Sequence, residues 1–192
     1  LIIRDQLGYE KFHPATERTW RILSQTYTND PGGRGKFATT PYPLGETLQR
    51  DFAGVAQTVR LVRGLTGQDV TTTANQTFQV DGYFTEPSFF SVFGFQLAAG
   101  NPATVLAEPN SIVLDQKTAT RLFGAQDPVG QVLMLKNLGN LKVTGVTLPP
   151  SGKSHIGFDC LVSVATLAAK EQLYPPAEAA NKILGNWAER YS

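Results

Sequence analysis

The chain has 192 residues, and its 41% hydrophobic and 17% charged residues are the balance of a globular protein that can bury a core without disulfides or metals. Its 17 Lys and Arg against 16 Asp and Glu give a net charge of +1, and neither half carries an excess of more than one charge. These values exclude a nucleic-acid-binding protein that relies on a basic surface, so we expect no nucleic acid partner.

Membrane and cysteine signals narrow the class of protein further. No stretch reaches the about 18 to 20 apolar residues of a membrane helix, and the first residues lack the basic-then-apolar pattern of a signal peptide. The single cysteine, Cys160, cannot form an internal disulfide, so it leaves the redox compartment open. Strand alternation predicts that Cys160 shares one face with Phe158, Val162 and Val164, which indicates a small buried hydrophobe rather than a catalytic thiol.

The N-terminal part is predicted to hold a short helix or turn over residues 5–13 and a strand over residues 18–28. Trp20 and Leu23 fall on opposite faces of that strand, so we expect it to be central in a sheet. The next eight residues, NDPGGRGK, form a glycine-rich loop. It fails as a phosphate-binding loop because Phe37 stands where that motif needs a hydroxyl residue.

A helix is predicted over residues 43–52, with a proline near its first turn. Leu44, Leu48 and Phe52 recur at every fourth position on one face of this helix. The spacing predicts that this face packs inward.

The middle of the chain is predicted to continue with strands over residues 55–62 and 77–84, joined by a threonine-rich hairpin tip around residues 71–73. A second short helix is predicted over residues 87–93, and it is rich in phenylalanine. Aromatic side chains at helical spacing are typical of a core, although the same cluster is compatible with a ligand pocket.

Residues 111–135 give the most consistent local signal in the chain. Residues 112–114 favour a strand, Asp115 is a good helix N-cap, and Gly124 ends the helical run. A Pro-Val-Gly turn then leads into a second strand over residues 131–136. On its own this is a well-specified strand-helix-strand piece without reactive groups.

The C-terminal elements are a β-hairpin, a loop, a buried strand and a short helix. They are predicted over residues 132–136 and 141–148 around a turn at 137–140, over 149–153, over 160–164 and over 166–173. Hairpins with inserted short helices favour an α+β fold with two small subdomains over a doubly wound parallel sheet.

Chemical signatures are sparse. The two histidines, His13 and His155, lie 142 positions apart and lack further ligands at metal-binding spacing. Asp159 follows His155 by four positions, which places both near one loop, and structural hydrogen bonding is the expected role. No serine-hydrolase, zinc-protease or nucleotide-binding motif occurs. We therefore assign no catalytic, cofactor-binding or metal residues, and we leave ligand and partner contacts unassigned.

Several sequence blocks, taken in chain order, resemble one known family. They are LGYEKFHP at 7–14 with ERTWRI at 17–22, PYPLG at 41–45, VDGYF at 80–84, FGF at 93–95 followed by Leu97, Gly100 and Pro102, residues 111–135, and SHIGFD at 154–159. Their order and spacing are similar to the MacB-like periplasmic core domain, which lies between the first and second membrane helices of FtsX-type ABC transporter permeases.

The resemblance implies a single MacB-like periplasmic core domain over residues 1–192. Residues 1–60 would belong to a membrane-proximal, porter-like α/β part, and about 75–175 to an inserted, mostly β subdomain with short helices. It also implies that Leu1-Ile2-Ile3 is the trimmed end of a preceding membrane helix, and that residues 187–192 enter a further strand, so that the C-terminal end is truncated.

The function implied by the resemblance is that of a non-catalytic extracytoplasmic domain, at the periplasmic face of the bacterial inner membrane, anchored through helices outside this chain. The domain would couple cytoplasmic ATP hydrolysis to periplasmic conformational change during export of a peptide, lipoprotein or small molecule, which is mechanotransmission. The implied partners are a second permease copy, a cytoplasmic ATP-binding subunit or domain, and a periplasmic adaptor or substrate protein. No cofactor is expected.

Two alternatives remain open from the sequence. One is a stand-alone periplasmic ligand-binding or sensing module whose pocket is lined by Phe84, Phe89, Phe90 and Phe93. The other is an enzyme of an unrecognised type.

Overall fold

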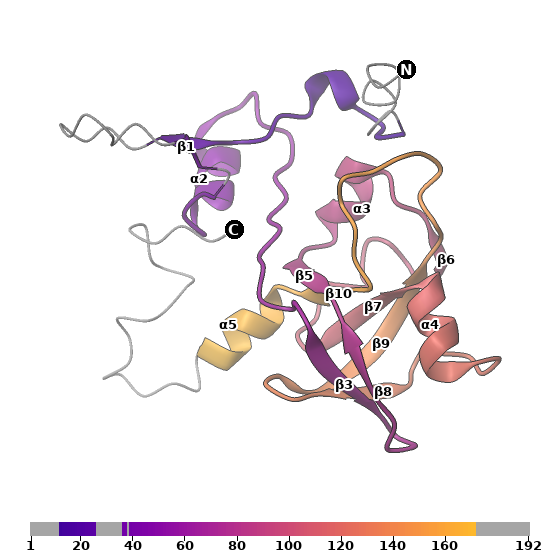
Figure 1. Cartoon of the computed structure of the whole chain (residues 1–192). Coiled ribbons are helices and arrows are strands. Elements are labelled where there is room, and N and C mark those ends of the chain that lie inside the picture. Colours follow the sequence, from indigo (N-terminus) through magenta and orange to yellow (C-terminus); the bar gives the residue numbers. More distant parts are fainter. Residues whose placement is uncertain (1–11, 26–35, 38, 172–192) are drawn as a thin grey trace.

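The computed structural model of the protein describes residues 12–25, 36–37 and 39–171 (Figure 1). Predictions that fall on other residues lie outside this part. They concern the helix or turn before His13, most of the glycine-rich loop, and both ends of the chain.

Within the described residues, eight strands form one sheet in the order β4-β3-β8-β9-β7-β10-β5, with β6 paired to β9. Their bounds are β3 Gln68–Thr72, β4 Thr77–Val80, β5 Gly82–Thr85, β6 Leu97–Ala99, β7 Ser111–Asp115, β8 Val132–Leu135, β9 Gly139–Thr147 and β10 Cys160–Ser163. A separate antiparallel pair joins β1 (Ser24–Gln25) to β2 (Lys36–Phe37).

Short helical segments accompany the strands, some beside the large sheet and others apart from it (Figure 1). They are the 3-10 turn η1 (Thr16–Arg18), α2 (Leu44–Asp51), α3 (Ser88–Phe93), α4 (Gln116–Phe123) and α5 (Ala165–Glu171). The ladders β7–β9 and β10–β5 are parallel, and the other ladders of the sheet are antiparallel. The predicted α+β class is confirmed, whereas the division into two subdomains stays a prediction.

The strand order closes the sheet on itself. β4 and β5 stand at opposite ends of the order, although only Asp81 separates them in the chain. One continuous stretch therefore pairs with β3 through its first half and with β10 through its second half. A sheet can meet both requirements only by curling until its ends come together, as in a small barrel.

Closure gives the sheet two separate cores. The inner core consists of side chains that face the inside of the curl, together with Ala119 and Leu122 of α4. The outer core lies on the opposite face, where α3 covers β7 and β10. Alternation along β7 shows the division, because Ile112 and Leu114 belong to the inner core and Val113 to the outer core, all three fully buried.

The strand-helix-strand piece over residues 111–135 is confirmed in its local structure. The Asp115 side chain caps α4 by accepting a hydrogen bond from the Thr118 N–H at 2.7 Å. Gly124 ends the helix with φ of +60°. The two strands are not neighbours in the sheet, because β9 pairs between β7 and β8. The predicted hairpin of β8 and β9 is also confirmed, with Leu135 opposite Gly139.

The N-terminal strand prediction is wrong over most of its described length. Arg18 belongs to η1, and only Ser24 and Gln25 are in strand conformation. Trp20 is 80% exposed and Leu23 is 53% exposed, so in the described part this segment is not a central strand. β-forming residues predicted a strand here, but a strand also needs a neighbour to pair with.

The predicted strand over residues 55–62 is extended chain rather than a ladder, and only Val62 forms a β-bridge, to Phe84. The first hairpin strand is β3 instead, so the tip shifts to residues 73–76, where Asn75 has a φ of +62°. The predicted strand over residues 77–84 divides into β4 and β5 at the corner that closes the sheet.

Two predictions about side-chain direction also fail. α2 exists, but none of its residues is buried, and Phe52 at its C-cap is 57% exposed. Phe158 packs in the outer core, whereas Cys160, Val162 and Val164 belong to the inner core. β10 begins at Cys160, so Phe158 lies before the strand and does not follow its alternation.

The corner at Asp81 and Gly82 requires glycine, which has no side chain, at position 82. A Cβ on Gly82 would lie 2.1 Å from the carbonyl oxygen of Cys160 on the neighbouring strand. Gly67 and Asp159 both bond to this corner: the Gly67 N–H donates to Asp81 Oδ1 at 2.7 Å, and the Asp159 N–H donates to the Asp81 carbonyl at 2.7 Å. The backbone of β5 can approach β10 only without a side chain at position 82.

We predict that Gly82→Ala lowers the free energy of unfolding by about 2–3 kcal/mol, because one of two backbones must shift. Chemical denaturation monitored by circular dichroism measures the change. Gly157→Ala is the matched control, since its Cβ would meet nothing within 4 Å. Equal stability of the two variants would contradict a closed corner.

Cys160 is buried as predicted, and burial raises the pKa of its thiol to about 12, with the carboxylates of Asp159, Asp115 and Asp81 adding to the effect. In the unfolded chain the thiol has its ordinary pKa of about 8.5. As pH rises from about 9 towards 12, the unfolded chain loses a proton that the folded chain keeps, so folding becomes less favourable.

We predict that the free energy of unfolding declines between pH 8 and about 10.5 more steeply in the wild type than in Cys160→Ala. The folded wild type should also resist thiol-labelling reagents at pH 8, where a free exposed thiol reacts readily. Rapid labelling of the folded protein would contradict this account.

Candidate functional site

α3 is the element around which the N-terminal block of the chain is arranged. Its side chains Phe89 and Phe90 are buried in the outer core, 0% and 4% exposed. The helix ends at Gly94, which adopts φ of +69° and ψ of +15° and donates its N–H to the Phe90 carbonyl at 2.9 Å. A left-handed residue at this point turns the chain sharply into Phe95. Because this residue is glycine, another segment can pack closely against the helix end, and we call this place the seat.

The block Phe12-His13-Pro14 occupies that seat. Pro14 Cδ would lie 2.7 Å from a Cβ on Gly94, and Phe12 Cδ1 would lie 3.2 Å from a Cβ on Gly152. Neither glycine leaves room for a side chain without movement of the N-terminal block. The early block and the FGF block at residues 93–95, which both carried the family resemblance, therefore meet here.

Aromatic rings connect these blocks, and we call the group the aromatic junction: Phe12, His13, Phe89, Phe93, Phe95 and Phe158. Phe12 meets His13 at 4.7 Å and Phe95 at 5.4 Å between ring centroids. His13 meets Phe93 at 5.2 Å, and Phe89 meets Phe95 at 5.1 Å and Phe158 at 5.7 Å. Several pairs are edge-to-face, the arrangement that aromatic quadrupoles favour.

An arginine joins the N-terminal side of α3 to the segment before the sheet. Arg60 donates from Nε and Nη2 to Glu86 Oε2 at 2.9 and 2.6 Å, and its backbone N–H donates to Oε1 at 3.0 Å. The guanidinium also lies 4.5 Å from the ring centre of Tyr42 and 3.1 Å from Glu46 Oε1. We call Arg60, Glu86, Glu46 and Tyr42 the arginine clamp.

Burial and pairing act in opposite directions on the clamp. Burial lowers the pKa of Arg60, but the hydrogen bonds and charge of Glu86 outweigh it, and the net pKa is raised. The side chains of Arg60 and Glu86 are only 18% and 16% exposed. Removing Arg60 would leave the mostly buried carboxylate of Glu86 without its ion-pair partner, which costs more than the loss of a surface ion pair.

His13 and Asp159 both lie among structural contacts, whereas the role predicted for His155 stays a prediction. His13 is buried within the aromatic junction. Asp159 accepts a hydrogen bond from the Asp81 N–H at 3.0 Å and lies 3.9 Å from Arg121 Nη2. The described residues contain no group of three His, Cys, Asp or Glu side chains placed to hold a metal ion.

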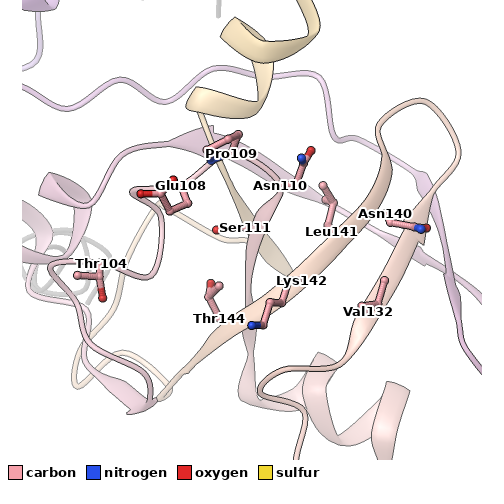
Figure 2. A pocket seen from close by; sticks show the side chains of 10 residues that line it. All are labelled: Thr104, Glu108, Pro109, Asn110, Ser111, Val132, Asn140, Leu141, Lys142 and Thr144. Atoms are coloured by element: carbon pink, nitrogen blue, oxygen red, sulfur yellow. The ribbon is translucent and has the colours of Figure 1, made fainter.

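The ligand pocket predicted between Phe84, Phe89, Phe90 and Phe93 is occupied by the rings themselves. Phe84 belongs to the inner core and the other three to the outer core. An open groove of about 360 Å³ lies elsewhere, beside the start of β7, and its lining includes Glu108, Asn110, Lys142 and Thr144 (Figure 2). One acid, one base and neutral polar groups along an open groove do not form a nucleophile-base arrangement.

Sequence reasoning missed the arginine clamp. Neither Arg60 nor Glu86 was singled out as a candidate residue from the sequence. The available signal was Glu86 directly before Pro87 at a helix start, where a carboxylate is favourable.

The closed sheet and the packing of the N-terminal block against the end of α3 define the class of protein. The MacB-like periplasmic core domain family matches residues 6–184, nearly the whole chain, and the chain belongs to this family. It is thus a periplasmic domain of the kind found in MacB-like ABC transporter permeases. No helix in the described residues is long and apolar enough to cross a membrane.

Solved structures share the fold at low sequence identity. A domain assigned to a permease of Porphyromonas gingivalis aligns with a TM-score of 0.62 and 21% identity, over 80% of this chain and 65% of that domain. The periplasmic region of MacB from Actinobacillus actinomycetemcomitans aligns with a TM-score of 0.52 and 14% identity, over 84% of this chain and 78% of that region.

The extracellular domain of the noncanonic ABC-type transporter YknZ from Gram-positive bacteria aligns with a TM-score of 0.53 and 13% identity, over 83% of this chain and 86% of that domain. The curated proteins give no match. The chain spans just under two thirds of the Porphyromonas domain, 65% of its length.

We predict that Gly94→Ala loosens the N-terminal block, because its Cβ would collide with Pro14 in addition to straining the left-handed backbone. Gly67→Ala is the matched control, since Gly67 has φ of +59° but open space around its Cβ. The control should lose about 1–2 kcal/mol of stability through backbone strain alone. Limited proteolysis of residues 12–18 should accelerate only in Gly94→Ala, and equal acceleration in both variants would contradict the seat.

Proposed function

We propose that this domain is a non-catalytic force transmitter within the permease, in which ATP hydrolysis on the cytoplasmic side drives conformational change on the periplasmic side. The cargo exported would be a peptide, a lipoprotein or a small molecule. The observation that carries the proposal is the aromatic junction, which seats Phe12, His13 and Pro14 against the end of α3.

Force transmission requires a body that moves as a unit. The closed sheet has a dry core on its inner face, and α3 covers a second dry core on the outer face. Close-packed interiors have low compressibility, so a displacement applied at one surface moves the whole body. A ligand-driven change of the transporter can then bias two discrete positions of this domain.

Attachment is the second requirement. Phe12 and Pro14 contact the α3 end and the loop at Gly152, and Arg60 holds the opposite end of α3 through Glu86. Both ends of one helix are thus fixed to segments that precede the sheet in the chain. This arrangement supports the proposed assignment of residues 1–60 to a membrane-proximal part and about 75–175 to an inserted part.

The remaining partners follow from family membership. We propose a dimer of two permease copies, a cytoplasmic ATPase that associates with them, and a periplasmic adaptor or substrate protein. The domain would lie at the periplasmic face of the inner membrane, anchored through helices outside this chain. The descriptions of the MacB and YknZ neighbours, as periplasmic and extracellular parts of transporters, support this placement.

The test uses the complete permease, reconstituted with its ATPase, with a spin label at Lys117→Cys on the exposed side of α4. Cys160 should not take the label, because its thiol is buried. We predict that nucleotide binding changes the distance between labels on the two copies, and that Phe12→Ala reduces the change by more than half. Lys142→Ala, in the open groove, is the control and should behave like the unmutated domain.

ATP hydrolysis should continue in Phe12→Ala, because the change loosens transmission and not the ATPase. An unchanged label distance on nucleotide binding in the unmutated permease would contradict the proposal. ATPase activity unaffected by deletion of residues 5–190 would also count against coupling.

A further inference from the structure

Residues 55–61 contact two helices, α2 and α3. The contacts with α3 are much stronger than those with α2. On the α3 side, the Ser88 hydroxyl donates to the Thr58 carbonyl at 2.9 Å, and the Ser91 hydroxyl donates to Gln57 Oε1 at 2.9 Å. Glu86 adds three bonds to Arg60 between 2.6 and 3.0 Å. Val59 and Leu61 pack on the outer core. The segment is therefore part of the rigid body.

On the α2 side the contacts are exposed, and the two that Gln49 makes are long. Gln49 Nε2 donates to the Ala56 carbonyl at 3.4 Å, and Thr58 donates to Gln49 Oε1 at 3.4 Å, both in exposed surroundings. Glu46 reaches Arg60 at 3.1 Å, but its side chain is 72% exposed. α2 buries none of its own residues, and the chain after it continues through the exposed Phe52.

Tyr42, two residues before the first residue of α2, is fixed. Tyr42 is 9% exposed, belongs to the inner core, and stacks under the Arg60 guanidinium. Val62, beyond the other end of the segment, is tied to Phe84 by two backbone bonds of 2.9 Å. α2 thus lies between two anchored points without being anchored itself.

We propose that α2 is a release element: its Glu46 detaches from Arg60 and the helix swings, while Arg60 keeps Glu86 and Tyr42. Detachment leaves no buried charge without a partner, because the guanidinium retains its bonds to Glu86. Detachment of Arg60 from Glu86 would instead separate two mostly buried charges, which is costly. The arginine clamp therefore opens on one side only.

The device would let the segments before the sheet change position without loosening the closed body. That role in transport rests on the proposed force transmission, whereas the one-sided release is a property of this chain alone. The two can therefore be tested separately.

Hydrogen exchange measured by mass spectrometry on the whole 192-residue chain tests the release. Glu46→Gln should speed exchange in residues 44–51 by about two- to fivefold, the range expected for loss of an exposed ion pair, and leave residues 88–93 unchanged. Glu86→Gln should speed exchange in both helices, because it removes the anchor that they share. Equal effects of Glu46→Gln on the two helices, or no effect on α2, would overturn the proposal.

A variant that stabilises α2 should change its hydrogen exchange rate in the opposite direction. A Cβ on Gly45 would meet Thr58 Oγ1 at 3.4 Å and Arg60 Cγ at 3.6 Å, which are ordinary contact distances. Gly45→Ala should therefore slow exchange in residues 44–51 by about two- to fivefold through helix propensity and added contact. Faster exchange in this variant would contradict the packing on which the proposal depends.

In the complete permease, Gly45→Ala should also reduce the nucleotide-dependent change in label distance at Lys117→Cys. If the exchange results hold and this distance change is unaffected by Gly45→Ala, the release element stands as a property of the chain but does not serve transport. If the unmutated permease shows no distance change at all, the proposed force transmission fails and the exchange results are untouched.

Discussion

The structure depends on one corner, where Asp81 and Gly82 pass the chain from β4 at one end of the strand order to β5 at the other. The corner is possible because Gly82 presents no side chain to the Cys160 carbonyl, 2.1 Å from where a Cβ would be. Asp81 then accepts from Gly67 and exchanges backbone and side-chain bonds with Asp159. A closed sheet has no long free edge there, which both stiffens it and limits edge-to-edge association.

Closure also determines where the attachment points can form. Once the sheet curls, β7 and β10 are covered on both faces, and their outer side chains Val113 and Leu161 need an apolar cover. α3 supplies it with Phe89 and Phe90. The same helix offers a left-handed glycine at one end and Glu86 at the other, so the aromatic junction and the arginine clamp both follow from the need to cover the outside of a closed sheet.

How far the sequence predicts this structure depends on how local each signal is. Asp115 and Gly124 define α4 within ten residues, so β7, α4 and the turn that follows were predictable. The closing corner was not, because residues 77–84 alternate like one strand and the two partner strands, β3 and β10, lie far apart in the chain. Residues 55–62 have strand-forming side chains, yet they are held by Glu86 and Ser88, 26 and 30 positions away. The family blocks correctly indicated which regions matter, and the contact of Phe12 and Pro14 with Gly94 explains why they occur together.

Under the proposed force transmission, the unusual features of the described residues act as restraints of different kinds. Close packing of the rings at the aromatic junction resists compression. The paired bonds of Arg60 to Glu86 are directional and resist shear, because the fork geometry is lost on sliding. The exposed contact of Glu46 resists little. A domain that must move as a body and still allow its neighbouring segments to shift needs all three, with the weakest restraint placed on an element that contributes nothing buried to either core, and α2 is such an element.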